Sequence, residues 1–108
     1  MTNFVLVLTT VPVGELGESL ARRLVDERLA ACVNVLAPMT SFYRWEGRVE
    51  RDVERQLIIK TTREQVDVVR ARLAECHSYE LPEFLVLEVA DGARAYLDWV
   101  RDATTIQA

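Results

Sequence analysis

The chain has 108 residues, half of them apolar, with a formal net charge of −4 and a sequence pI near 5.0. This length predicts one domain, residues 1–108, and the acidic balance excludes the basic surface of a nucleic-acid-binding protein. Two cysteines do not make a disulfide framework, and the apolar run 4–8, with no positive leader before it, is too short for a signal peptide or a membrane span. We therefore expect a soluble, reduced, cytoplasmic protein with no membrane partner.

The first elements follow from the spacing of the apolar residues. Residues 4–8 form a continuous apolar run, which is typical of a central strand. A helix is predicted over 13–29, because apolar residues recur every three or four positions on one face; they are Val13, Leu16, Leu20, Leu24 and Val25. Gly17 weakens this helix by up to about 1 kcal/mol relative to alanine, and close packing against the sheet is the expected reason for it.

A long β-hairpin is predicted over residues 30–61, with its turn at 45–48, where Gly47 supplies a positive φ. At roughly 3.3 Å per residue, the arm 31–45 would be about 50 Å long if straight. A chain of this size folds to a diameter of roughly 34 Å. The hairpin therefore either bends, with Pro38 as the expected point of a bulge, or projects from the domain.

Three aromatic residues, Phe42, Tyr43 and Trp45, lie near the predicted tip. A projecting two-stranded ribbon is marginally stable, and its free edges tend to pair with other chains. We expect the tip to dock on another subunit, with Tyr43 and Trp45 as interface anchors. The alternative is a bent hairpin that folds back on its own core.

Residues 62–65 have the Thr-x-x-Gln spacing of a capping box, and Val66, Val69 and Leu73 predict the buried face of a second helix that ends near Glu75. The aperiodic segment 76–83 is predicted to be a loop. The apolar residues 84–87 predict another buried strand, which ends at Val89. A last helix is expected with Asp91 as its cap and a stripe of Ala93, Tyr96, Leu97 and Val100.

This order, β-α-β-β-α-β with a short terminal helix, predicts an α+β protein with the ferredoxin-like split βαβ arrangement. Both long helices should lie on one face of an antiparallel sheet. The other face needs a cover that one short helix cannot supply in full, which is a second argument for an oligomer.

The sequence contains no CxxC, HExxH, Gly-rich phosphate loop or Ser/His/Asp set, so no enzyme is predicted. His77 is the single histidine, at a helix end where the dipole favours its charged form. With Tyr79, Glu80 and Glu83 close by in sequence, its imidazole is an acceptable ligand for Cu(II) or Zn(II). The alternative is a solvent-exposed histidine that ends a helix.

Two further residues have two interpretations each. Cys32 opens the first arm of the hairpin, where a cysteine is usually a small buried apolar residue and less often a ligand. Lys60 is either a lysine with its stem on the sheet or a cation in an inter-subunit cleft, facing Glu80, Glu83 or an anionic ligand.

Five motifs in order resemble the CutA divalent-cation-tolerance family; they are Ala30-Ala31-Cys32-Val33-Asn34-Val35, Ser41-x-Tyr43-x-Trp45-x-Gly47, Ile58-Ile59-Lys60-Thr61, His77-x-Tyr79-Glu80-x-Pro82-Glu83 and Tyr96-Leu97-x-Trp99. The resemblance implies a ferredoxin-like subunit, a homotrimer built through the hairpins, a bacterial cytoplasmic location and tolerance of copper and other divalent cations. It also implies metal ligation by Cys32 and His77. The chain lacks, over 8–12, the further cysteine that some members carry, and it has Ser78 where many members have proline.

We therefore expect a non-enzymatic homotrimer that needs no cofactor and binds Cu(II) or another divalent cation weakly, through His77 with Cys32, Glu80 and Glu83. One alternative is a sensor, similar to the PII proteins, that holds an anionic ligand between subunits. The residues of that cleft or interface would be Tyr43, Trp45, Lys60 and Tyr79. Another is a structural trimer that acts through partner proteins.

Overall fold

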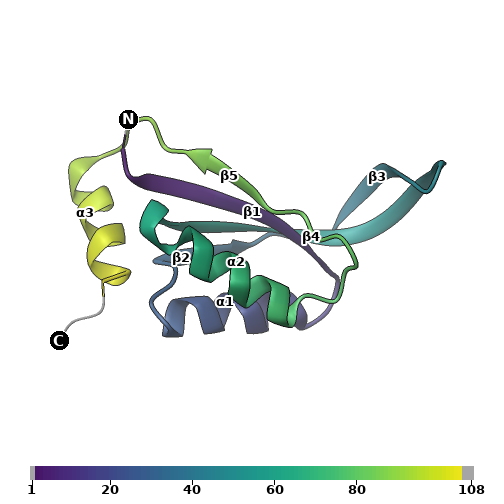
Figure 1. Cartoon of the computed structure of the whole chain (residues 1–108), viewed down its shortest axis with the longest axis horizontal. Helices are drawn as coiled ribbons and strands as arrows, with labels where there is room; N and C mark the ends of the chain where they lie inside the picture. The colour runs from purple at the N-terminus through teal and green to yellow at the C-terminus, as the bar shows by residue number, and fades with distance from the viewer. Residues whose placement is uncertain (1, 106–108) are drawn as a thin grey trace.

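The computed structural model of the chain describes residues 2–105 as an antiparallel sheet with helices packed on it (Figure 1), which confirms the predicted α+β class. The strands are β1 (Phe4–Pro12), β2 (Cys32–Val35), β3 (Met39–Trp45), β4 (Arg48–Thr62) and β5 (Leu85–Glu88). The helices are α1 (Leu16–Asp26), α2 (Val66–Cys76) and α3 (Arg94–Ala103). No helix in this part of the chain is long and apolar enough to cross a membrane.

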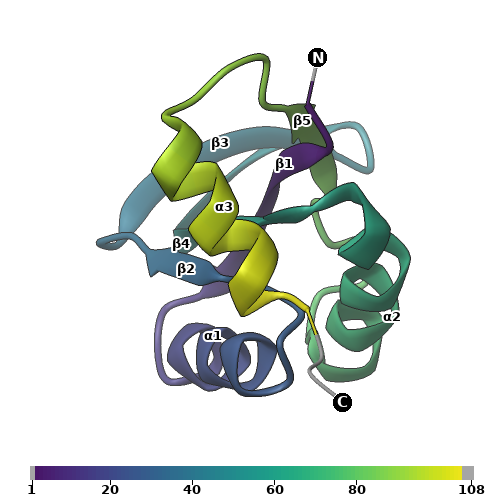
Figure 2. The same ribbon diagram turned by 90° about the vertical axis from the view of Figure 1, so that its left-hand side faces the viewer.

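The sheet has the order β2-β4-β1-β5, and β3 also pairs with β4. Every pair is antiparallel. Figure 2 shows α1 and α2 side by side on one face of the sheet, while α3 crosses one end of it. β4 is the organising strand, because it pairs with β1 along its second half and with the two-part arm β2 and β3 on its other side.

The core lies between the sheet and the helices α1 and α2. Its fully buried members alternate along the strands and recur along the helices, as half-covered strands and amphipathic helices require; they include Val5, Val7, Leu57 and Ile59 from the sheet and Leu24 and Val69 from the helices. Gly17 lies where α1 meets the sheet. A Cβ atom there would lie 3.1 Å from Cγ2 of Val11, so the expected close packing at Gly17 is confirmed.

The first arm of the hairpin is two strands with a bulge between them. Val35 pairs with Leu57 and Met39 pairs with Glu54, so the three residues 36–38 face two residues of β4. The extra residue sits at the predicted position, next to Pro38, which cannot donate to the ladder. The bulge also exchanges the two faces of the arm: even-numbered residues of β2, but odd-numbered residues of β3, share a face with the even-numbered residues of β4.

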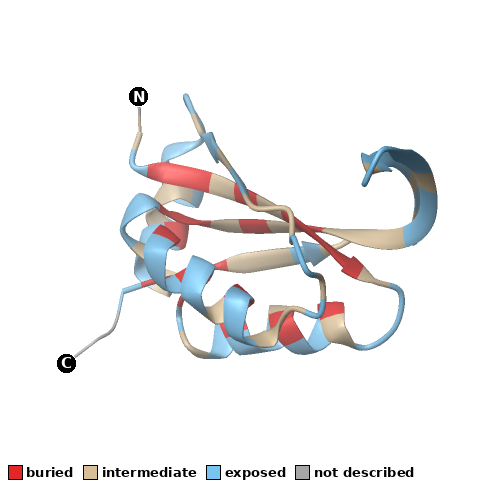
Figure 3. Ribbon diagram, turned by 45° about the vertical axis from the view of Figure 1, so that its right-hand side comes forward, coloured by how far each residue is buried: buried red, intermediate tan, exposed pale blue. Residues whose placement is uncertain are grey.

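The hairpin turns at the predicted position. Glu46 and Gly47 both have positive φ, 50° and 80°, which is the signature of a type I′ turn. The ribbon beyond the sheet projects (Figure 1) and makes the molecule 47 Å long but only 26 by 23 Å across. Figure 3 shows this ribbon largely exposed while the strands behind it are buried, and Phe42 near the tip is 68% exposed.

Helix α1 is shorter than predicted at both ends. Gly14, with φ 128°, turns the chain before the helix begins. Arg28 adopts φ 60°, and the amide of Leu29 donates to the carbonyl of Leu24, which is the Schellman pattern of a helix end. The assignment of Val13 and Val25 to the buried face is wrong: Val13 precedes the helix and is 51% exposed, and Val25 lies within the helix but is 42% exposed.

Two predicted caps are wrong. Gln65 does not close a capping box: its side-chain amide donates to the carbonyl of Thr104 at 3.1 Å, and a 3-10 turn, Arg63–Gln65, precedes α2. Asp91 does not cap α3, which begins after Ala93, and its carboxylate accepts instead from the amide of Gly92. In both cases tertiary or local bonding competes with the helix end for the same side chain.

The expectation of a buried last strand is also wrong for one of its faces. Leu85 and Leu87 are 54% and 44% exposed, because α3 covers only the end of the sheet where Val100 packs with Phe4 and Ala31. The stripe assigned to α3 is narrower than predicted, and Tyr96 within it is exposed.

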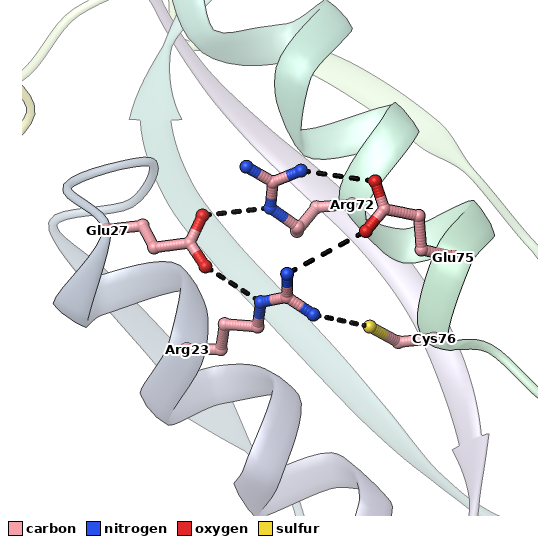
Figure 4. Close-up of polar contacts among 5 residues, drawn as sticks. All are labelled: Arg23, Glu27, Arg72, Glu75 and Cys76. Carbon is pink, nitrogen blue, oxygen red and sulfur yellow. Dashed lines mark hydrogen bonds and ion pairs between the residues drawn. The ribbon is translucent and has the colours of Figure 1, made fainter.

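Polar contacts join α1 to α2 at the solvent side of the core (Figure 4). The Glu27 carboxylate accepts from Nε of Arg23 at 2.7 Å and from Nε of Arg72 at 2.8 Å. Both arginines also approach Glu75, and Arg23 donates to the Sγ atom of Cys76 at 3.1 Å. The hydrogen bonds that Glu27 accepts, first from Arg23 and then from Arg72, hold the pKa of its carboxyl below the usual value.

Candidate functional site: an acidic cleft at the base of the hairpin

An open cleft of about 860 Å³ lies where the hairpin leaves the body of the molecule. One side is formed by β3 and β4, and the other by the loop 77–84, which runs beside β4 between α2 and β5 (Figure 1). Among residues 2–105, four carboxylates and no lysine or arginine line it; the carboxylates are Asp52, Glu54, Glu80 and Glu83. We call this feature the acidic cleft.

The strands position the hairpin side of the acidic cleft through the period of two. Glu54 and Asp52 alternate along β4, and they pair with Met39 and Ser41 of β3. Tyr43 follows on the same face, and its hydroxyl donates a short hydrogen bond to the Asp52 carboxylate. The pKa of Tyr43 rises to about 12, first because of this hydrogen bond and second because of partial desolvation.

The loop side of the acidic cleft is tied to β4 by two side-chain hydrogen bonds. The Tyr79 hydroxyl donates to the Glu54 carboxylate at 3.0 Å, and the Gln56 amide donates to the Glu83 carboxylate at 2.8 Å. Burial, and then the bond to Glu54, raises the pKa of Tyr79 above its usual value. The donors to these carboxylates are neutral, so they orient the carboxylates without cancelling their charge.

His77 is the first residue of this loop; it is not among the residues that line the cleft, and it is half-buried rather than exposed. Its Nε2 atom is 2.5 Å from the carbonyl oxygen of Thr10, and its Nδ1 atom accepts from the amide of Tyr79 at 3.1 Å. Since a carbonyl can only accept and an amide can only donate, the ring is neutral with its proton on Nε2. Both ring nitrogens are thus engaged.

Cys32 and Lys60 lie elsewhere on the sheet. They pair with each other across β2 and β4, six residues along β4 from Glu54, which corresponds to roughly 20 Å. The structure therefore brings Glu80, Glu83, Tyr43, Tyr79 and Trp45 to the acidic cleft, but it places Cys32 and Lys60 away from it within one chain. Across residues 2–105, no three His, Cys, Asp or Glu side chains converge into a ready metal site.

Reasoning from the sequence missed the contribution of β4. The face of β4 that lines the cleft carries a polar residue at every second position: Asp52, Glu54 and Gln56. The signal was an acidic residue at every second position after the turn, which marks one face of a strand. That signal is present in the sequence, but only the position of the loop 77–84 shows that this face of the strand lines a cleft.

Comparisons with known proteins agree with the motifs. A family model described as the CutA1 divalent ion tolerance protein matches residues 5–103. The divalent-cation tolerance protein CutA of Thermus thermophilus is 46% identical over 98 residues, which cover 91% of this chain and 95% of that protein.

Solved structures match over the same span. The Cut A1 structure from Thermus thermophilus superposes with a TM-score of 0.91 at 44% identity, over 94% of this chain and 99% of that one. The CutA structure from Xylella fastidiosa gives 0.93 at 38% identity, over 96% of this chain and all of that one. The residues matched by the family model include every residue that lines the acidic cleft.

Proposed function

The chain belongs to the CutA1 divalent ion tolerance family, and we propose that it serves in the tolerance of, or response to, divalent cations without catalysing a reaction. In this proposal it binds the cations weakly in the acidic cleft. The observation that carries the proposal is the lining: four carboxylates with no lysine or arginine among them. Carboxylate oxygens attract divalent cations, and water supplies the remaining coordination positions.

Glu80 and Glu83, which the sequence predicted as ligands, keep that role here, and Asp52 and Glu54 join them from β4. His77 and Cys32, the two other ligands predicted from the sequence, stay predictions, and each would need a change in the structure to bind a cation in the cleft. His77 would have to give up a hydrogen bond at whichever nitrogen it offered, at about 0.5–1.5 kcal/mol for each bond lost. Cys32 would have to act from another part of the sheet.

The alternative function, a sensor of an anionic ligand, has less support from this lining. The cation it required was Lys60, which is not among the lining residues. The charged side chains that an anion would face in the cleft of one chain are all carboxylates, and like charges close together repel. A neighbouring subunit would have to supply the positive charge.

The assembly we propose is a homotrimer of ferredoxin-like subunits in the cytoplasm. Two features support association: the projecting ribbon with exposed Phe42, and the open sheet face with exposed Leu85 and Leu87. Large exposed apolar side chains that share a surface, as Leu85 and Leu87 share one face of β5, mark interaction sites. Light scattering should give three times the chain mass of 12.3 kDa, and a mass of one chain at micromolar concentration would contradict the proposal.

The cation proposal is tested by titration calorimetry and thermal shift with Mn(II), Cu(II) and Zn(II), and with citrate as an anionic probe. The wild type should be stabilised by the cations in proportion to RT ln(1 + [L]/Kd). The double variant Glu80→Gln/Glu83→Gln keeps the acceptors and removes two charges, so we expect cation affinity to fall at least about tenfold.

The matched control is Asp67→Asn/Asp102→Asn, which removes the same charge from exposed positions outside the acidic cleft. Equal losses of affinity in the two double variants would mean that cations respond only to net charge. A shift with citrate and none with any cation would favour the sensor instead.

A further inference from the structure

We infer that His77 is a positioning residue for the acidic cleft and not one of its ligands. The inference rests on the proposed function only in naming what the cleft holds. The evidence for the role of His77 lies in the loop 77–84, which forms one side of the cleft. Apart from the amide of His77 itself, which donates to Leu73, no backbone-to-backbone hydrogen bond outside helices and strands involves this loop in the described chain.

Side chains therefore hold the loop in place: Tyr79 and Glu83 bond to β4, and His77 provides the link to β1. Strand β1 continues past Leu8, its last residue paired with β5. The carbonyl of Thr10 beyond that point accepts from Nε2 of His77 at 2.5 Å. The other ring nitrogen, Nδ1, accepts the amide of Tyr79 at 3.1 Å, so one imidazole joins β1 to the loop.

Tyr79 carries the link across to the hairpin. Its ring lies against the imidazole, with centroids 4.7 Å apart, and its hydroxyl donates to the Glu54 carboxylate of β4 at 3.0 Å. The path from β1 through His77 and Tyr79 to Glu54 thus fixes one side of the cleft against the other. Glu80 is the next residue in the chain and takes its place from this path.

Ligation and positioning are alternatives for this ring. Nδ1 has the only free electron pair of the neutral imidazole, and the Tyr79 amide occupies it; a metal at Nε2 would displace the bond to Thr10. While the loop is held, a cation in the cleft meets carboxylate oxygens and, among the described residues, no imidazole or thiolate. Such a donor set suits Mn(II), Mg(II) or Ca(II) better than Cu(II), which favours nitrogen and sulfur.

The test compares His77→Phe, which keeps a ring but makes neither bond, with His77→Gln, whose amide can donate to Thr10 and accept from Tyr79. In the metal-free protein, hydrogen exchange of the Tyr79 amide should be about tenfold faster in His77→Phe, the loss of one bond of ordinary strength. It should return to near the wild-type rate in His77→Gln. Unchanged exchange in His77→Phe would overturn the positioning role.

The second measurement uses metals. Mn(II) affinity should fall about tenfold in His77→Phe and recover in His77→Gln. Because the chain has one histidine, electron spin echo modulation from the remote nitrogen of an imidazole bound to Cu(II) can arise only from His77. We expect none in the wild type, and its presence would make His77 a ligand. If Mn(II) does not bind the wild type at all, the proposed cation site fails, while the exchange measurement still decides the role of His77.

Discussion

Strand β4 passes through two different environments. In its second half it lies between β1 and β2 under α1 and α2, and its residues Leu57 and Ile59 are fully buried. In its first half it pairs with β3 alone and carries the exposed side chains Val49 and Val53. The comparison teaches that one strand can serve stability at one end and recognition at the other, because burial within the chain is confined to the helix-covered half.

The largest effect is expected in the helix-covered body. Leu24→Ala should lower the free energy of unfolding by about 2–5 kcal/mol, because it leaves a cavity among fully buried side chains. Denaturant unfolding measures the change. The matched control is Val25→Ala, one residue on and exposed, which should change stability by less than about 0.5 kcal/mol. Equal losses would show that the face assignment of α1 is wrong in the assembled protein.

The hairpin should show the opposite behaviour. Trp45→Ala should weaken assembly by about 2 kcal/mol, roughly thirtyfold in affinity, because large aromatic residues anchor interfaces. Unfolding of the single chain should change little, since Trp45 lies in the ribbon outside the core. Light scattering over a dilution series measures the dissociation. An unchanged dissociation profile would remove Trp45 from the interface.

Gly17→Ala probes the contact between α1 and the sheet. The added Cβ would lie 3.1 Å from Val11 and 3.4 Å from Val35, both in packed surroundings. Overpacking of this kind costs about 1–3 kcal/mol, which exceeds the gain of up to about 1 kcal/mol in helix propensity. We expect a net loss of about 1 kcal/mol in thermal or denaturant unfolding. A net gain would mean that the helix shifts away from the sheet at no cost.

Alkaline pH should act on the hairpin through Tyr43. Folding raises the pKa of this phenol from about 10 to about 12, so its contribution is present below pH 10 and is lost as pH rises towards 12. Tyr43→Phe should lose less stability than the wild type across this window. Asp52→Asn should behave like Tyr43→Phe, because it removes the carboxylate partner. Identical pH profiles for all three proteins would contradict the assignment.

The smallest effect belongs to the turn. Glu46 holds φ 50°, which is unfavourable for glutamate and well tolerated by asparagine. Glu46→Asn should therefore stabilise the hairpin by a few tenths of a kcal/mol, measured as slower amide exchange in β3 without a change in the core. Faster exchange at the tip would mean that the Glu46 side chain makes a stabilising contact, which the substitution removes.

The sequence was sufficient where local rules decide the outcome and insufficient where distant groups compete. Gly47 marked the turn, and Val69 the buried face of α2, because both signals depend on near neighbours. Gln65 was misassigned since its partner, Thr104, lies 39 residues away. The end of α1 was misplaced because Arg28, and not glycine, takes the left-handed position.

The same division applies to the acidic cleft. Glu80, Glu83 and Tyr79 were predicted because they cluster in one short polar loop. Lys60 was expected to face Glu80 or Glu83 across a subunit boundary, which stays a prediction; within one chain it lies beside Cys32, at the far end of β4 from the cleft. Periodicity assigns a residue to a face of a strand, but only the pairing of whole elements shows how far along that face it lies.

The bulge at 36–38 is where this protein can vary in length. These residues are exposed and contain a proline, and they lie outside the pairing that sets the faces of the tip. The two-residue turn at Glu46 and Gly47 sets that pairing, and it puts Tyr43 on the same face as Asp52. Adding or deleting one residue at the bulge would therefore leave the aromatic face of the tip beside the carboxylates, whereas a one-residue change in the turn would move it to the other face of the ribbon. Natural variants should differ in length at the bulge and keep the two-residue turn, and a library of insertions should lose function at the turn first.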